Sequence, residues 1–170
     1  PIKPLILAAA CTAGVHSVSH AITCNGHLLQ DKPDQFRCWY FKQFGQTHGP
    51  LHAVEAIAYS CNIYFYTLGR ALGPKHLPDW LMRFGVGRPL DLGVGAEFAG
   101  IPAMHSDGSS ISIGEAILVG IGQGPVAWTP VHAADVYATL ARGGMRLAPH
   151  ILKDAPPKPD DLHLDPGALE

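Results

Sequence analysis

Apolar residues recur every three or four positions in several separate stretches of the chain, which is the pattern of amphipathic helices. The first stretch follows Pro4, and we predict a helix within residues 4–22 that ends at Gly14, because glycine is common at helix ends. The same periodicity predicts further helices over residues 51–58, 63–72, 77–84 and 129–142. The pattern as a whole predicts a chain rich in helix.

Two of these helices carry additional signals. In residues 51–58 the apolar positions that share one helix face, and that we expect to be buried, are Leu51, Val54, Ile57 and Ala58. At the start of residues 129–142, Thr129 suits the N-cap and Pro130 the first helical position, and glycines follow the last turn. The stretches 23–49, 88–114 and 153–166 fit neither period, and we expect loops with short strands in the second and a surface connection in the third.

Composition narrows the class of protein. The chain has 170 residues, of which 47% are apolar and 15% charged, and this suits one folded domain. Its formal net charge of -2 leaves no basic excess to neutralise a phosphate backbone, so we expect no nucleic-acid partner. The apolar runs are shorter than the roughly 18 residues that span a bilayer.

The two ends of the sequence resemble cut points within a longer domain. Pro1 stands where a start methionine is expected, and Asp165-Pro166 has the residues of a helix start close to the last residue. An alternative for the beginning is a lipoprotein signal, because the apolar run from Leu5 ends in Ala-Ala-Ala-Cys11. Such a signal needs a basic region, which a single lysine hardly supplies, so we expect an internal part of a longer protein.

The tripeptide Ser60-Cys61-Asn62 separates two predicted helices. If these residues are extended, the side chains of Ser60 and Asn62 point to one side and that of Cys61 to the other. The hydroxyl can pass on a proton, and the carboxamide can both donate and accept hydrogen bonds from a peptide. Taken alone, the pattern is equally typical of a helix N-cap.

Several motifs occur together in a fixed order over residues 1–150, and with them the chain resembles the transpeptidase domain of penicillin-binding proteins, most closely class B proteins of the elongation type. The motifs that carry the resemblance are Cys38-Trp39, His48-Gly49-Pro50-Leu51, Ser60-Cys61-Asn62-Ile63-Tyr64-Phe65-Tyr66, Leu72-Gly73, Trp80 with Phe84-Gly85-Val86-Gly87, Gly120-Ile121-Gly122-Gln123-Gly124 and Thr129-Pro130.

The family uses three catalytic motifs, Ser-x-x-Lys, Ser-x-Asn and Lys-Ser/Thr-Gly. By resemblance Lys3 is the lysine of the first motif, which places the nucleophilic serine directly before Pro1, and Ser60 and Asn62 form the second. Since none of the lysines precedes Ser/Thr-Gly, the third motif is expected beyond Glu170. Residues 1–170 are thus expected to be a partial transpeptidase domain that is inactive by itself.

The resemblance implies an α+β fold of the serine beta-lactamase and transpeptidase type, with a central antiparallel sheet between helices and a mostly helical share in this chain. It implies a D-Ala-D-Ala transpeptidase that cross-links peptidoglycan stem peptides, supports cell wall synthesis and cell shape, and binds beta-lactams. In it Lys3 is the base, Ser60 the proton relay and Asn62 the substrate amide ligand. The whole protein is expected in the periplasm, anchored to the inner membrane by a region outside this chain. Alternatives are a non-catalytic penicillin sensor or scaffold, and a serine beta-lactamase.

Four further residues form a potential metal site, namely Cys24, Cys38, His48 and Cys61. Their spacing matches no zinc-finger signature. If Cys61 points away from Ser60 and Asn62, however, a structural zinc ion bound by three thiolates and one imidazole would hold the catalytic tripeptide from behind. Some elongation-type relatives are similar in carrying a metal here, although with carboxylates among its ligands. The alternatives are a disulfide between Cys24 and Cys38, which suits a protein outside the cytoplasm, and free buried thiols.

The glycines at 120, 122 and 124 precede a predicted helix, as they do in dinucleotide-binding proteins. Their spacing lacks the third glycine of that motif, and no acidic residue follows at the required distance. We therefore expect no nucleotide cofactor, and expect these glycines to serve a tight backbone turn.

Overall fold

The computed structural model describes residues 1–90, 92, 98–151 and 158–169. The helices in these ranges are α1 (Lys3–Thr12), α2 (Trp39–Phe44), α3 (Ala53–Ala58), α4 (Asn62–Arg83), α5 (Ile113–Val119), α6 (Pro130–Ala141) and the 3-10 turn η1 (Pro166–Ala168). The strands are β1 (Ile22–Cys24), β2 (Gly49–Leu51), β3 (Ile101–Pro102), β4 (Val126–Ala127), β5 (Met145–Arg146) and β6 (Asp160–Asp161). The prediction that the chain is rich in helix and poor in strand is confirmed.

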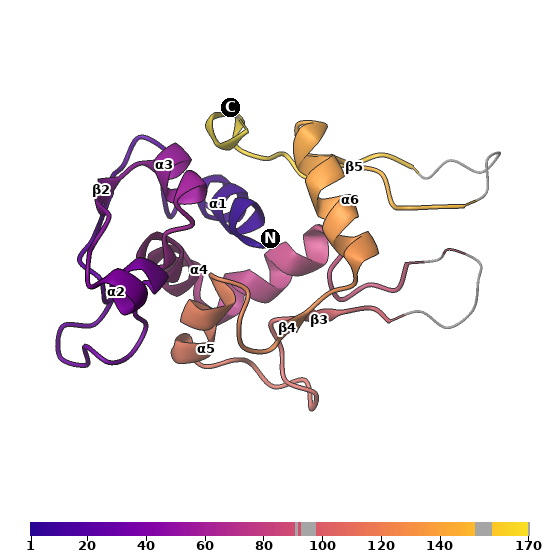
Figure 1. The fold of residues 1–170 in the computed structure, drawn as a ribbon. Coiled ribbons are helices and arrows are strands. Elements are labelled where there is room, and N and C mark those ends of the chain that lie inside the picture. The colour runs from indigo at the N-terminus through magenta and orange to yellow at the C-terminus, as the bar shows by residue number, and fades with distance from the viewer. Residues whose placement is uncertain (91, 93–97, 152–157, 170) are drawn as a thin grey trace.

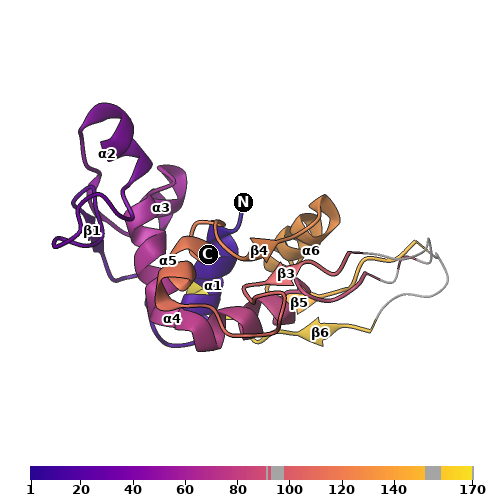
Figure 2. The ribbon, with the colours of Figure 1, turned by 90° about the horizontal axis from the view of Figure 1, so that it is seen from below.

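The elements form a helical centre with strand pairs on either side (Figure 1). Helix α4 packs against α1 and α5, and the buried apolar residues form one cluster around them. The strands pair antiparallel as β1 with β2, β3 with β4, and β5 with β6. Seen from below, α2 and β1 project to one side of this centre, and β3, β5 and β6 to the other (Figure 2).

Helix α1 lies in the core. All residues from Leu5 to Cys11 are buried, as expected for a short helix that is apolar on every side. The helix ends at Thr12, and Gly14 has a left-handed φ of 70°, so the predicted end is confirmed while the predicted range of 4–22 is too long. No helix among the described residues is both long and apolar enough to cross a membrane.

Helix α4 joins two of the predicted helices. Residues 63–72 and 77–84 were expected to be separate, and the structure places a sharp kink between them at Gly73, whose φ of 66° and ψ of -177° are not helical. Pro74 follows and cannot donate a backbone hydrogen bond, so the chain changes direction there and then resumes the helix.

The predicted helix over 51–58 differs from the structure at its start and in its buried face. Leu51 belongs to strand β2, and α3 begins at Ala53. Val54 is 74% exposed and Ile57 is 39% exposed, whereas Ala53 and Ala56 are buried. The small alanine side chains face the core because α3 packs on α1, and this turns the larger apolar residues outward.

Helix α5 begins at Ile113, at the very end of the stretch 88–114 for which we predicted loops with short strands, and no helix was predicted over its remaining residues. Its start has a complete capping box, in which the Ser112 hydroxyl accepts a hydrogen bond from the Glu115 backbone N–H at 3.2 Å and the Glu115 carboxylate accepts one from the Ser112 N–H at 2.8 Å. The Ser-x-x-Glu pattern is visible in the sequence and predicts this helix start.

Helix α6 agrees with its prediction. The Thr129 hydroxyl accepts a hydrogen bond from the His132 backbone N–H at 3.2 Å, and Gly143 follows with a left-handed φ of 68°. The start expected at Asp165-Pro166 is also present as η1, where the Asp165 carboxylate caps the Ala168 N–H at 3.1 Å. Part of the predicted connection over 153–166 lies outside the described residues.

Candidate active site and metal centre

Three of the predicted site residues meet at the beginning of α1. The Lys3 ammonium donates hydrogen bonds to the Ser60 carbonyl at 2.6 Å, the Ser60 hydroxyl at 2.7 Å and the Asn62 side-chain carbonyl at 3.1 Å. Lys3 lies in the first turn of α1 and Asn62 in the first turn of α4. The packing of these two helices therefore brings together residues that are almost sixty positions apart in the sequence.

The backbone between α3 and α4 determines the orientation of the Ser60 and Asn62 side chains. Cys61 is extended, with φ -62° and ψ 118°, whereas Ser60 has a left-handed φ of 52° and Asn62 begins α4. The extended conformation considered for the tripeptide is therefore present at Cys61 alone. A serine in this region is strained and must be held by its surroundings. Two backbone hydrogen bonds do so, from the Ser60 N–H to the Ile57 carbonyl and from the Cys61 N–H to the Ala56 carbonyl, each 3.0 Å long.

The surroundings of Lys3 act on its pKa in both directions, and burial has the largest effect. Burial lowers the pKa of the Lys3 ammonium below its ordinary value of 10.5, although negative charge at Cys61 and at Cys38 opposes the shift. The Phe65 ring lies under the amine nitrogen with its centroid 5.4 Å away, and this contact favours the charged form. A lysine with a lowered pKa carries an amine that can accept a proton nearer to neutral pH.

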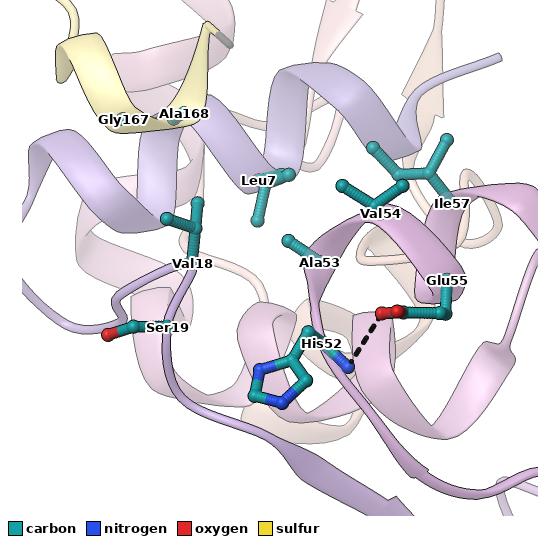
Figure 3. A pocket seen from close by; sticks show the side chains of 10 residues that line it. All are labelled: Leu7, Val18, Ser19, His52, Ala53, Val54, Glu55, Ile57, Gly167 and Ala168. Carbon is teal, nitrogen blue, oxygen red and sulfur yellow. Dashed lines mark hydrogen bonds between the residues drawn. The ribbon is translucent and has the colours of Figure 1, made fainter.

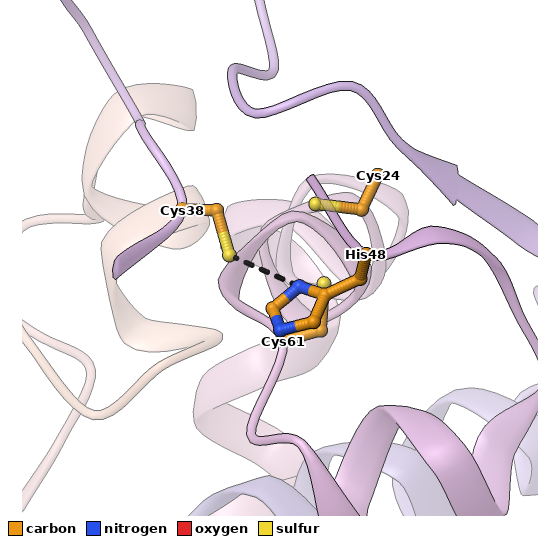
Figure 4. A group of neighbouring side chains, drawn as sticks. All are labelled: Cys24, Cys38, His48 and Cys61. Atoms are coloured by element: carbon orange, nitrogen blue, oxygen red, sulfur yellow. Dashed lines mark hydrogen bonds between the residues drawn. The ribbon is translucent and has the colours of Figure 1, made fainter. Parts of the chain in front are cut away.

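The four predicted metal ligands also come together (Figure 4). One ligand atom from each of Cys24, Cys38, His48 and Cys61 lies within 4.8 Å of all the others. The Cys38 sulfur is 3.6 Å from Nδ1 of His48. All four cysteines of the chain are free thiols, so the Cys24–Cys38 disulfide that we weighed is not formed in this structure.

These side chains fit a tetrahedral zinc ion. With Zn–S distances of about 2.3 Å the ligand atoms of such a site are about 3.8 Å apart, and the observed cluster is only slightly wider. The three cysteines are fully buried, and hydrogen bonds from Cys24 and Cys61 lower the pKa of the Cys38 thiol while their own pKa values are raised. The thiolate is the form of cysteine that binds zinc.

Each ligand comes from the end of a different element. Cys24 ends β1, Cys38 is the N-cap of α2, His48 directly precedes β2, and Cys61 is the N-cap of α4. The cluster consequently joins the irregular segment 22–51 to the central helix.

Sequence reasoning missed the aromatic shell around His48. The Tyr40 ring stacks on the imidazole with centroids 4.8 Å apart, and the Tyr59 ring lies nearly parallel to the imidazole at 5.9 Å. The indole nitrogen of Trp39 donates a hydrogen bond to the Tyr59 carbonyl at 3.2 Å. The adjacent aromatic residues Trp39-Tyr40, next to a predicted ligand, were the available signal.

A separate apolar cavity of about 460 Å³ lies between α1, α3 and η1 (Figure 3). Leu7, Val54 and Ala168 are among the residues that line it, whereas Lys3, Ser60 and Asn62 are not. At its edge the His52 backbone N–H donates a hydrogen bond to the Glu55 carboxylate at 3.1 Å. The cavity holds no set of polar groups comparable to that at Lys3.

Curated relatives share the sequence over most of the chain. The peptidoglycan D,D-transpeptidase MrdA of Acinetobacter baumannii is 31% identical over 158 residues, which include 89% of this chain and 23% of the relative. MrdA of Haemophilus influenzae is 32% identical over 158 residues, with 89% of this chain and 24% of the relative covered. The chain therefore spans about a quarter of the length of these relatives.

Structural and family comparisons agree with this result. A crystal structure of Pseudomonas aeruginosa PBP2 in complex with WCK 5153 superposes with a TM-score of 0.83 at 29% identity, over 99% of this chain and 40% of that one. The predicted penicillin-binding and beta-lactamase type of fold is thereby confirmed. The family model of the penicillin binding protein transpeptidase domain matches residues 2–170. The chain belongs to the family of penicillin-binding protein transpeptidase domains.

Proposed function

We propose that the chain supplies Lys3, Ser60 and Asn62 to the active site of a serine D,D-transpeptidase that cross-links peptidoglycan stem peptides and is acylated by beta-lactams. The observation that carries this proposal is the position of the Lys3 amine. It lies 2.7 Å from the Ser60 hydroxyl and 3.1 Å from the side-chain carbonyl oxygen of Asn62. Relatives named as peptidoglycan D,D-transpeptidases support it.

The first half of the reaction forms an acyl-enzyme. The nucleophile is a serine directly before Pro1, one helical turn from Lys3. Its hydroxyl attacks the carbonyl between the two D-Ala residues and gives its proton to the neutral amine of Lys3. Ser60 relays this proton to the leaving amine, so the peptide bond breaks, the last D-Ala departs and an ester forms on the serine. The side-chain oxygen of Asn62 accepts a hydrogen bond from Lys3. The side-chain NH₂ group of Asn62 thus remains available to donate a hydrogen bond to a substrate carbonyl.

The second half of the reaction regenerates the free serine. An amine of a neighbouring stem peptide loses a proton to the Ser60 and Lys3 pair and attacks the ester. The new amide forms as the ester bond breaks, and the serine oxygen recovers a proton. Because the substrate is cell wall peptide, the whole protein acts in the periplasm, attached to the inner membrane by a part outside these residues, and contributes to cell shape.

We also propose that Cys24, Cys38, His48 and Cys61 bind one structural zinc ion. Four protein ligands close the coordination shell, so the ion supplies rigidity and leaves no open position for substrate. Cys61 lies between Ser60 and Asn62, and its anchoring would keep the strained backbone of Ser60 in place.

The test uses the longer polypeptide that contains this chain, incubated with a fluorescent penicillin. We expect a stoichiometric covalent adduct that is released slowly, and we expect Ser60→Ala to slow its formation by about 10²- to 10⁴-fold through loss of the relay. Rapid release would identify a beta-lactamase. No adduct at all would contradict the proposal.

A further inference from the structure

A cavity of about 480 Å³ opens next to Ser60, and most of its wall is aromatic. The residues that line it are Trp39, Tyr40, His48, Ala58, Tyr59 and Ser60. Neither a lysine nor an arginine is among these lining residues, all of which belong to the described part of the chain. The residues around the cavity therefore offer aromatic rings and hydroxyl groups, but no positively charged lysine or arginine, to a ligand.

The rings are exposed but fixed in place. Trp39 is 38% exposed and Tyr59 is 54% exposed. Both fractions are high for such large aromatic side chains. The hydrogen bond from the Trp39 indole to the Tyr59 carbonyl joins the two sides of the cavity, and stacking holds Tyr40 against His48. A site whose side chains are already ordered loses little entropy on binding.

The charge behind the cavity is negative once the proposed zinc is bound. Three thiolates and one divalent ion leave one net negative charge, and His48 belongs both to this centre and to the cavity wall. The faces of aromatic rings also carry negative charge density, and Trp and Tyr attract cations within about 6 Å of the ring centre. Both effects favour a small organic cation.

We propose that this aromatic cavity binds a primary ammonium group, and that in the reaction it receives the amine of the acceptor stem peptide. The assignment rests on the proposed function, which requires an amine to approach the acyl-enzyme. Ser60 lines the cavity and its hydroxyl contacts Lys3, so an amine bound there lies beside the group that takes its proton. Trp39, Tyr40 and Tyr59 are then binding residues for the acceptor.

The test compares two probes that differ in one charged group, Nα-acetyl-lysine methylamide and the uncharged Nα-acetyl-norleucine methylamide. Each is titrated into the zinc-loaded longer polypeptide that contains this chain, and binding is followed by the NMR signal of the Trp39 indole N–H, assigned with Trp39→Phe. We expect the lysine probe to shift this signal saturably and the norleucine probe to leave it unchanged. Equal binding of both probes, or binding of neither, overturns the proposal.

Variants of Tyr59 separate ring recognition from a general change in structure. Tyr59→Leu should weaken the lysine probe by about two- to fivefold, whereas Tyr59→Phe, which keeps the ring face, should bind it as the original chain does. Phe98→Leu, at another exposed aromatic residue, is the matched control. Equal affinity in Tyr59→Leu and Tyr59→Phe contradicts a role for the ring. If penicillin still acylates the longer polypeptide while the lysine probe fails, only the amine subsite is refuted.

Discussion

The helical centre and the segment 22–51 are stabilised in different ways. In the centre, α1, α4 and α5 bury continuous apolar surface, and Leu5, Phe65 and Leu68 are almost fully buried. In the segment 22–51, strands β1 and β2 have three residues each, and α2 has no buried residue. The segment meets the central helix at the cluster of Cys24, Cys38, His48 and Cys61, and partly buried apolar residues such as Leu28 and Phe36 pack against the core.

This difference has a consequence for the active site, because Ser60 and Asn62 lie where the two regions join. Lys3 approaches from the helical centre, while Cys61 belongs to the cluster. Hydrophobic packing thus positions Lys3, the proposed base, and metal coordination is expected to position Ser60, the proposed relay. Changes in the two regions should be separable by experiment.

The largest effect is expected from loss of the cluster. We predict about one zinc ion per chain, lost in Cys61→Ser, since structural zinc contributes about 10–16 kcal/mol of apparent binding free energy in small domains. Metal analysis measures the loss, and hydrogen exchange should show deprotection of 22–51 with α1 and α4 retained. Cys11→Ala, at a cysteine outside the cluster, should keep its zinc. Zinc retained in Cys61→Ser would refute the ligand set.

The second largest effect is expected from a change at Lys3, the proposed base. Burial lowers the pKa of Lys3, and only its neutral amine accepts a proton, so the rate of acylation by penicillin should rise with pH as the ammonium loses its proton. Lys3→Arg stays protonated and should lower the rate by about 10²- to 10⁴-fold and remove this rise. Stopped-flow acylation of the longer polypeptide from pH 6 to pH 10 measures both. A pH profile shared by Lys3→Arg and the original protein would show that another group is the base.

A substitution that creates a cavity in the helical centre should lower the stability of the fold without affecting zinc binding. Leu68 is 1% exposed in α4, and Leu68→Ala should lower the free energy of unfolding by about 2–5 kcal/mol. Urea denaturation measures this change, and the zinc content should stay at one per chain. Val54→Ala, at a 74% exposed position, should change stability by less than about 0.5 kcal/mol. A parallel loss of zinc in Leu68→Ala would show that the two regions are not independent.

The smallest effect is expected from a substitution at the contact between α4 and α5. A Cβ atom at Gly120 would collide with the Phe65 carbonyl oxygen, whereas one at Gly114, inside α5, would meet its nearest neighbours at 3.9 Å. Gly120→Ala should therefore cost about 1–3 kcal/mol of stability, and Gly114→Ala should add up to about 1 kcal/mol through helix propensity. Thermal unfolding of the two variants compares them directly. A neutral Gly120→Ala would mean that the helices can separate at little cost.

Sequence reasoning was accurate where one local signal decides the structure. Thr129-Pro130, followed by apolar residues at helical spacing, predicted the start of α6 correctly. Gly14 predicted the end of α1, and Gly73 predicted the point where α4 is interrupted. The resemblance also selected Lys3, Ser60 and Asn62, which meet in space. The role of each of these residues stays a prediction.

Features that depend on tertiary contacts were not predicted. Periodicity could not show that α3 buries Ala53 rather than Val54, because the close packing on α1 decides this. The left-handed backbone of Ser60 has no local signal, since serine rarely adopts it. The stacking of Tyr40 and Tyr59 around His48 likewise requires three segments to be placed together.

The most direct test of the central claim is to locate the penicillin adduct in the longer polypeptide by peptide mass spectrometry. The account predicts one adduct, on a serine that directly precedes Pro1, and no adduct on the purified 170-residue chain. That result would place Lys3, Ser60 and Asn62 around a nucleophile they do not themselves supply. An adduct on Ser60, or on the 170-residue chain alone, would contradict the account.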